Sequence, residues 1–152
     1  MAREPGSWGR RRAGVVLVSD DGIALIERIR AGRTYYVFPA GGIEDGETAE
    51  ATAVRECLEE LGLAVRLGGL AAVIYFRPQN SWQYYFHAEA IGGVFGTGTG
   101  PEYDSASSER GSYRPIWVPP AQLPRLDVRP PKLAALMAEP HSLDVPRTLY
   151  EP

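Results

Sequence analysis

The sequence of 152 residues has very few of the side chains that form disulfides or soft metal sites, with one cysteine and two histidines. A single cysteine, Cys57, excludes an intrachain disulfide and is typical of proteins in a reducing cytoplasm, where we expect this protein. His87 and His141 have no partner at the spacing of zinc ligands, so we interpret both as structural.

Long apolar runs and an excess of positive charge are also missing. No stretch approaches the ~18 apolar residues that a membrane span needs, so we expect no membrane partner. The first apolar run ends at Val18, before Asp20 and Asp21, and is too short for the core of a signal peptide. The net charge of -3 argues against a nucleic-acid polymer as partner.

What remains is the composition of an ordinary globular domain, with 44% hydrophobic and 23% charged residues. We predict a flexible arm over residues 1–12, one domain over 13–140 and a tail over 141–152. The Gly- and Ser-rich segment 92–112 is too long for a simple connector, which indicates a functional or a disordered loop.

Hydrophobic patterning predicts a mixed α/β domain. Thr48 is a plausible N-cap for the first helix, and Gly62 lies just past its end. The predicted strands cover residues 13–18, 23–29, 35–38, 70–76, 83–91 and 113–118, and the predicted helices cover 48–61 and 132–137.

The first helix carries three glutamates on one side. On a helical wheel, Glu56, Glu59 and Glu60 fall within an arc of about 100°. Like charges one turn apart cost about 0.2–0.5 kcal/mol, and a divalent cation would remove that repulsion. Carboxylates are the hard oxygen ligands that Mg²⁺ or Mn²⁺ prefers. The opposite side, predicted to face the core, carries Val54, Leu58 and Leu61.

Glutamates on one helix face are usually just solvated, but here the spacing favours a specific motif. From Gly41 the chain has five residues, Glu47, seven residues and then the letters RECLEELGL. This segment resembles the complete Nudix box, and Phe38-Pro39 leads into it as is usual in that family. One departure is Ala40, where the family usually has glycine. The resemblance implies a Nudix-type α/β/α sandwich with a mixed central β-sheet.

The resemblance also implies a reaction. Nudix hydrolases attack one phosphorus of a diphosphate with water, and bound Mg²⁺ (or Mn²⁺) neutralises the phosphate charge. Glu47 and Arg55 would hold the helix and its carboxylates in place. Gly41 and Gly62 would be turn positions that use glycine's freedom in φ. The implied metal ligands are Glu56, Glu59, Glu60 and the backbone carbonyl of Ala40, with Glu56 or a loop glutamate as base.

The family often adds a carboxylate from a loop about forty residues past the box. Glu102 lies at that distance inside the long loop, so we predict it as a further metal ligand or catalytic base. Glu109 is the alternative. Either glutamate can instead be a solvated loop charge.

Signals about the substrate are weaker. Pro78 resembles a marker of ADP-ribose pyrophosphatases, although one proline after a strand usually marks only the strand end. Cys57 fills an apolar position of the box and is interpreted as a core residue. Candidate phosphate contacts, for which solvation at the surface is the alternative for at least two, are Arg28, Arg30 and Arg33. Candidate base-stacking residues, for which core packing is the alternative, are Trp82, Tyr84 and Phe86.

We therefore predict an enzyme that acts on a small nucleoside-diphosphate-type substrate. Its oligomeric state is left open, and a homodimer is one option. One alternative is a Nudix domain that senses nucleotides without cleaving them. Such domains usually lose box carboxylates, which this chain keeps. A second is an isoprenoid-diphosphate isomerase, which usually adds a catalytic cysteine outside the box, and Cys57 is the only cysteine.

Overall fold

The computed structural model describes residues 10–99, 111–139 and 147–151. In these ranges a mixed β-sheet is covered by helices on both faces, which confirms the predicted α/β class and sandwich. The strands are β1 (Arg11–Ser19), β2 (Gly22–Arg30), β3 (Arg33–Val37), β4 (Ala40–Gly42), β5 (Leu63–Phe76), β6 (Ser81–Gly93), β7 (Ser112–Val118), β8 (Val128–Arg129) and β9 (Arg147–Glu151). The helices are α1 (Ala49–Leu61) and α2 (Pro131–Ala138), with short 3-10 helices η2 (Arg77–Gln79) and η4 (Pro120–Arg125).

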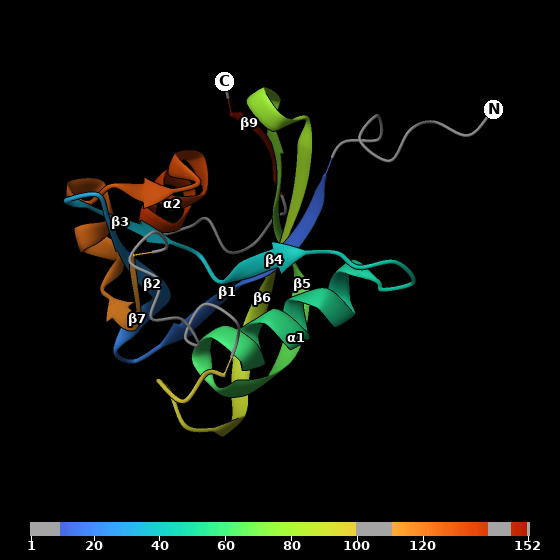
Figure 1. Ribbon diagram of the computed structural model, residues 1–152, viewed down its shortest axis with the longest axis horizontal. Coiled ribbons are helices and arrows are strands. Elements are labelled where there is room, and N and C mark those ends of the chain that lie inside the picture. The colour runs from blue at the N-terminus through green and yellow to red at the C-terminus, as the bar shows by residue number, and fades with distance from the viewer. Residues whose placement is uncertain (1–9, 100–110, 140–146, 152) are drawn as a thin grey trace.

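Strand β1 connects the two halves of the sheet. The strand order is β8-β3-β2-β1-β6-β5-β9, while β4 pairs with β1 and β7 pairs with β2. Along its first residues β1 is parallel to β6 and antiparallel to β4, and its last two residues pair with β2. This arrangement places β4 beside the start of β1, close to α1 (Figure 1).

Two hydrophobic clusters hold the helices to opposite faces of the sheet. Successive side chains of a strand point to opposite faces. Val15 and Leu17 of β1 accordingly pack into one cluster and Val16 into the other. Helix α1 supplies Ala53, Cys57 and Leu61 to the first cluster, and α2 supplies Leu133, Leu136 and Met137 to the second.

Helix α1 begins and ends where its sequence signals predicted. The Thr48 hydroxyl accepts a hydrogen bond from the backbone N–H of Ala51 at 3.0 Å, which satisfies a donor of the first turn. Gly62 takes the left-handed conformation, with φ 78°, and its N–H donates to the carbonyl of Leu58. In the part of the chain that is described, neither helix has the length and apolar character required to cross a bilayer.

Several predicted boundaries were wrong. Strands β4, β8 and β9 were not predicted, because two to five residues carry too little pattern and their partner strands are distant in sequence. Strand β5 begins at Leu63 instead of residue 70, and β1 begins at Arg11, within the predicted arm. The predicted tail includes β9, which pairs with β5, and the Glu151 carboxylate accepts a hydrogen bond from the Lys132 N–H at 2.7 Å.

The first part of the long loop lies against the C-terminal end of α1. The backbone N–H of Gly96 donates to the carbonyl of Leu61 at 2.9 Å. Gly98 approaches so closely that an added Cβ would lie 2.7 Å from the carbonyl oxygen of Glu60. Both predicted loop glutamates, Glu102 and Glu109, fall outside the described residues.

Candidate active site

The glutamate side of α1 faces the protein interior, contrary to the helical-wheel prediction. Glu56 and Glu60 are only 7% and 9% exposed, whereas Val54 and Leu58 are 37% and 53% exposed. The wheel was misleading because α1 contacts the sheet through smaller side chains beside Leu61, which is buried as predicted. Burying carboxylates is costly unless hydrogen bonds compensate, so this face has a purpose other than packing.

Arg55 binds the carboxylates of the box together. Its Nε and Nη2 donate to the two oxygens of Glu47 at 2.7 and 2.9 Å, a bidentate pair. Its Nη1 donates to Glu56 at 2.8 Å and to Glu59 at 3.3 Å. Its Nη2 also donates to the carbonyl of Gly42 at 3.1 Å, which ties the helix to β4. One guanidinium therefore donates hydrogen bonds to three glutamates on two segments of the chain.

The Glu47 carboxylate accepts hydrogen bonds from more than one donor. Besides Arg55, its carboxylate accepts hydrogen bonds from the Thr52 hydroxyl at 2.7 Å and the Glu44 backbone N–H at 3.1 Å. These bonds, that from Arg55 first, lower the pKa of Glu47 to about 2. The same bond from the other side is the main cause that raises the pKa of Arg55. Glu47 is therefore an anion throughout the physiological pH range.

Glu60 and Arg12 bind the two backbone polar groups of Ala40, a residue of β4. The Ala40 N–H donates to Glu60 Oε2 at 3.1 Å, and the Ala40 carbonyl accepts from Arg12 Nη2 at 3.1 Å. A Cβ on Gly14 would lie 2.5 Å from the Ala40 Cβ, so glycine there lets β4 pair closely with β1. Alanine at position 40 thus keeps its carbonyl beside the glutamate face, and Arg12 takes one of that oxygen's two lone pairs.

The two box glycines have different functions. Gly62 needs its left-handed conformation, as predicted. Gly41 has no positive φ, and the prediction of a turn there was wrong, because it lies in β4. A Cβ on Gly41 would collide with the carboxylate of Glu56. Glycine is therefore required there so that this carboxylate can lie against the backbone.

The donors on this face suit a hard divalent cation in kind, because they are carboxylate and carbonyl oxygens. Among the described residues, however, no three acidic, histidine or cysteine side chains converge as they would around a metal ion. Arg55 accounts for part of this, because its Nη1 lies between Glu56 and Glu59. The further ligand predicted from the loop, Glu102, is outside the described ranges.

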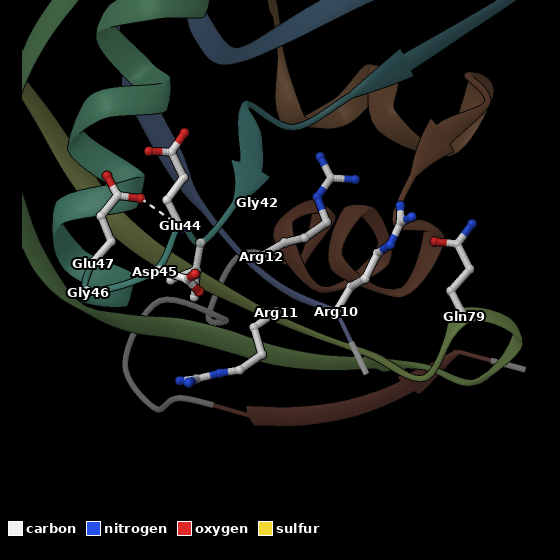
Figure 2. A pocket seen from close by; sticks show the side chains of 10 residues that line it. Arg10, Arg11, Arg12, Gly42, Glu44, Asp45, Gly46, Glu47 and Gln79 are labelled. Atoms are coloured by element: carbon white, nitrogen blue, oxygen red, sulfur yellow. Dashed lines mark hydrogen bonds between the residues drawn. The ribbon is translucent and has the colours of Figure 1, made fainter. Parts of the chain in front are cut away.

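A pocket of about 660 Å³ opens beside the box loop. One wall is basic and comes from the start of β1, and the facing wall is the acidic segment between β4 and α1 (Figure 2). It is lined by Arg10, Arg11, Arg12, Gln79, and Gly42 to Glu47.

The predicted stacking residues do not form one exposed platform. Phe86 is buried in the core, and Tyr84 is half-buried, with the Arg11 guanidinium 5.6 Å from its ring centre. Trp82 lies against Tyr75, with ring centres 4.8 Å apart. The alternative of core packing is therefore confirmed for Phe86.

The three arginines of the β2–β3 hairpin have separate surroundings. The Arg28 guanidinium lies 3.6 Å from the ring centre of Tyr113, a close cation–π contact. Arg30 and Arg33 line a second, smaller pocket of about 220 Å³ together with Arg129. The hairpin thus carries positive charge, on a different part of the surface from the box loop.

The remaining candidates are structural or lie outside the description. Cys57 is fully buried, and burial raises the pKa of its thiol to about 12, which fits a core residue. Burial also lowers the pKa of His87. Pro78 lies in η2, where it starts a single turn. His141 is outside the described residues.

Sequence reasoning missed the basic wall of the pocket. Residues 1–12 were predicted to be an arm, so Arg10, Arg11 and Arg12 were not considered. Three consecutive arginines directly before an apolar strand were the available signal, since residues two apart on a strand share a face. Gln79 had no such signal, because only the turn of η2 brings it to β1.

Comparison with known proteins identifies the family. The sequence model of the NUDIX domain matches residues 8–138, which is most of the chain. This chain belongs to the Nudix family. The predicted family and enzyme class, a Nudix hydrolase, are thereby confirmed, and the box residues above are those of the family motif.

Curated relatives and solved structures agree with the assignment. An RNA pyrophosphohydrolase of Sphingopyxis alaskensis is 35% identical over 85 residues, which is 55% of this chain and 51% of the relative. One of Aeromonas hydrophila is 41% identical over 58 residues, or 38% and 33% of the two chains. The matches thus span between about a third and a half of these relatives.

The solved structures share the fold at low sequence identity. A NUDIX hydrolase from Nitrosomonas europaea has a TM-score of 0.65 at 22% identity and covers 94% of this chain and 80% of its own. An ADP-ribose pyrophosphatase from Streptococcus suis has a TM-score of 0.62 at 16% identity and covers 94% and 99%. At such identities the likeness shows the fold alone.

Proposed function

We propose that this Nudix domain is a Mg²⁺- or Mn²⁺-dependent hydrolase that cleaves a diphosphate linkage in a small nucleotide-type molecule. The observation that carries the proposal is the inward glutamate face of α1. Glu56 and Glu60 are buried, and hydrogen bonds from Arg55 and from the Ala40 N–H orient them. Burying carboxylates costs free energy, and this cost is expected at a site whose carboxylates bind a positive charge.

The metal would be held by Glu56, Glu59 and Glu60 with the Ala40 carbonyl. Once bound, such a cation offsets phosphate charge and lowers the pKa of coordinated water. The chain itself fixes the position of each carboxylate: Arg55 sets Glu56 and Glu59, and the Ala40 N–H sets Glu60. Glu56 is one candidate for the base that takes the proton of the attacking water.

Glu102 is our candidate for the additional ligand or base. Gly98 lies against the backbone of Glu59 and Glu60, and Glu102 follows four residues later. We expect Glu102→Gln to lower kcat more than it raises KM. A larger kcat loss in Glu109→Gln would assign the role to Glu109 instead.

A second candidate function is removal of pyrophosphate from RNA with a 5′-triphosphate. It is favoured by the relatives named RNA pyrophosphohydrolase, which match up to 55% of this chain. The chemistry at phosphorus would be the same. The net charge of -3 disfavours extensive contact with an RNA backbone, so recognition would have to concentrate on the 5′ end.

The two non-hydrolase alternatives have less support. A nucleotide sensor would not need the complete set of box carboxylates, which this chain has. An isomerase that used Cys57 would need its thiol exposed, whereas Cys57 is buried with a pKa near 12.

A substrate panel tests the proposed function. Nucleoside triphosphates, ADP-ribose, dinucleoside polyphosphates, sugar nucleotides and a short 5′-triphosphate RNA would each be incubated with Mg²⁺, and phosphate and pyrophosphate release measured. We expect turnover of at least one compound, abolished by EDTA and restored by excess Mg²⁺. Turnover that persists fully in EDTA, or none on any compound, would contradict the proposal.

A further inference from the structure

Arg10 and Arg12 form a basic wall that no step of the proposed chemistry uses. Arg10 directly precedes β1 and Arg12 is its second residue, and their side chains point the same way, with Gln79 beside Arg10 (Figure 2). Arg11 points the other way, over the ring of Tyr84.

This wall has positive charge without a protein counterion. Within residues 10–99, 111–139 and 147–151, neither Arg10 nor Arg12 forms an ion pair, although Glu44 and Asp45 line the same pocket. In the same ranges the Nε–H of Arg12 is buried with no hydrogen-bond acceptor. An anionic ligand in the pocket would supply the negative charge that the described residues do not place beside Arg10 and Arg12.

Arg12 joins this pocket to the glutamate face. Its Nη2 binds the carbonyl of Ala40, and the N–H of that residue binds Glu60. A phosphate chain with one linkage at the glutamate face would therefore continue toward Arg12 and Arg10. The acidic wall opposite repels anions and leaves the arginine side as the place for phosphate oxygens.

We propose that Arg10 and Arg12 bind phosphate groups beyond the linkage that is cleaved, so that the preferred substrates carry a linear chain of three or more phosphates. The inference rests on the proposed function and narrows its substrate class. A 5′-triphosphate on a nucleoside or on RNA, and a dinucleoside polyphosphate, have this chemistry. A conjugate with only two phosphates, such as ADP-ribose, would leave the arginine wall unused.

Binding of inorganic tripolyphosphate tests the wall without turnover. Its Kd would be measured by calorimetry in EDTA for wild type, Arg10→Gln, Arg12→Gln and the control Arg66→Gln. Arg66 is an exposed arginine of β5 that pairs with Glu89 on the surface. We expect each pocket variant to bind about 10-fold more weakly, because each loses charge-assisted hydrogen bonds, and the control to match wild type. No binding by wild type, or equal Kd values in Arg10→Gln and wild type, would overturn the inference.

Arg10→Gln is the decisive variant, because Arg12→Gln also loses the bond to Ala40. Steady-state kinetics then compare ATP, 5′-triphosphate RNA and ADP-ribose. We expect Arg10→Gln to raise KM for the triphosphates by about 10-fold with little change in kcat, and to leave ADP-ribose within about 2-fold. A larger effect on RNA than on ATP would identify the RNA end as the source of the triphosphate. Equal effects on ATP and ADP-ribose would refute the inference. If no substrate is turned over while tripolyphosphate binds through Arg10, the proposed function fails and the anion site stands.

Discussion

Arg55 and Arg12 each donate to a backbone carbonyl of β4, that of Gly42 and that of Ala40, yet their environments are opposite. Arg55 has carboxylates from Glu47, Glu56 and Glu59 within 3.3 Å, whereas Arg12 has only a backbone carbonyl among the described residues. The carboxylates around Arg55 neutralise its charge, and Arg55 holds the local structure of the protein. Arg12 retains the charge that a ligand can use. We therefore base the proposal of which arginine binds substrate on its counterions and not on residue type alone.

The largest effect is expected from a change in the carboxylates of α1. Glu60→Gln keeps an oxygen that can accept from the Ala40 N–H but removes the negative charge. We expect kcat to fall at least ~100-fold, the size of a lost catalytic electrostatic interaction, with circular dichroism unchanged. Glu89→Gln, on the exposed surface of β6, is the matched control and should retain full activity. Near-normal turnover by Glu60→Gln would show that the charge of Glu60 is not needed for the reaction.

A smaller effect should distinguish Arg55 from Arg10 by the free energy of unfolding of their lysine variants. Lysine keeps the charge of Arg55 but cannot bind Glu47 with two parallel hydrogen bonds. We expect Arg55→Lys to lower the free energy of unfolding by about 1–3 kcal/mol, the range for a broken buried network. Arg10→Lys, at a position without ion pairs in the described part, should stay within about 0.5 kcal/mol. Urea unfolding of both variants measures the difference. Equal losses would show that Arg55 is no more structural than Arg10.

The smallest effect concerns pH. The pKa of Glu47 is lowered in the folded protein to about 2, below its ordinary value of 4.5. Its contribution to stability is thus fully present above about pH 4.5 and is lost as pH falls toward 2. We expect the Tm difference between wild type and Glu47→Gln to be constant from pH 8 to 5 and to shrink below pH 4. A difference that grows on acidification would contradict the bonding of Glu47.

The contacts within the box were predictable because they depend on the number of residues between its members. Glu47 and Arg55 are eight residues apart in sequence, and the fixed turn from β4 into α1 brings them into contact. The helix limits were also predictable, since Thr48 and Gly62 act through local hydrogen bonds and φ. These features depend on neighbours within about a dozen residues.

The orientation of α1 was not predictable in the same way. A wheel assumes that apolar residues face inward, but Val54 and Leu58 are exposed and Glu56 and Glu60 are buried. What decides the orientation is contact with β4, where Gly41 leaves room for a carboxylate. That contact depends on a three-residue strand paired with β1, which no local pattern reveals. The basic wall was missed for the same reason, because its position depends on strand pairing.

Strand β9 has a consequence for the solubility of the folded protein. It pairs with the last five residues of β5, Ala72 to Phe76, a stretch that includes buried Ile74 and two aromatic rings. Without this cover, β5 would present unpaired backbone groups and apolar side chains to other molecules, which invites intermolecular strand pairing. Its anchor is the Glu151 carboxylate, which accepts a hydrogen bond at the first turn of α2. Residues 147–151 thus cover part of the long edge of β5 with a five-residue edge strand, which offers less backbone for such pairing.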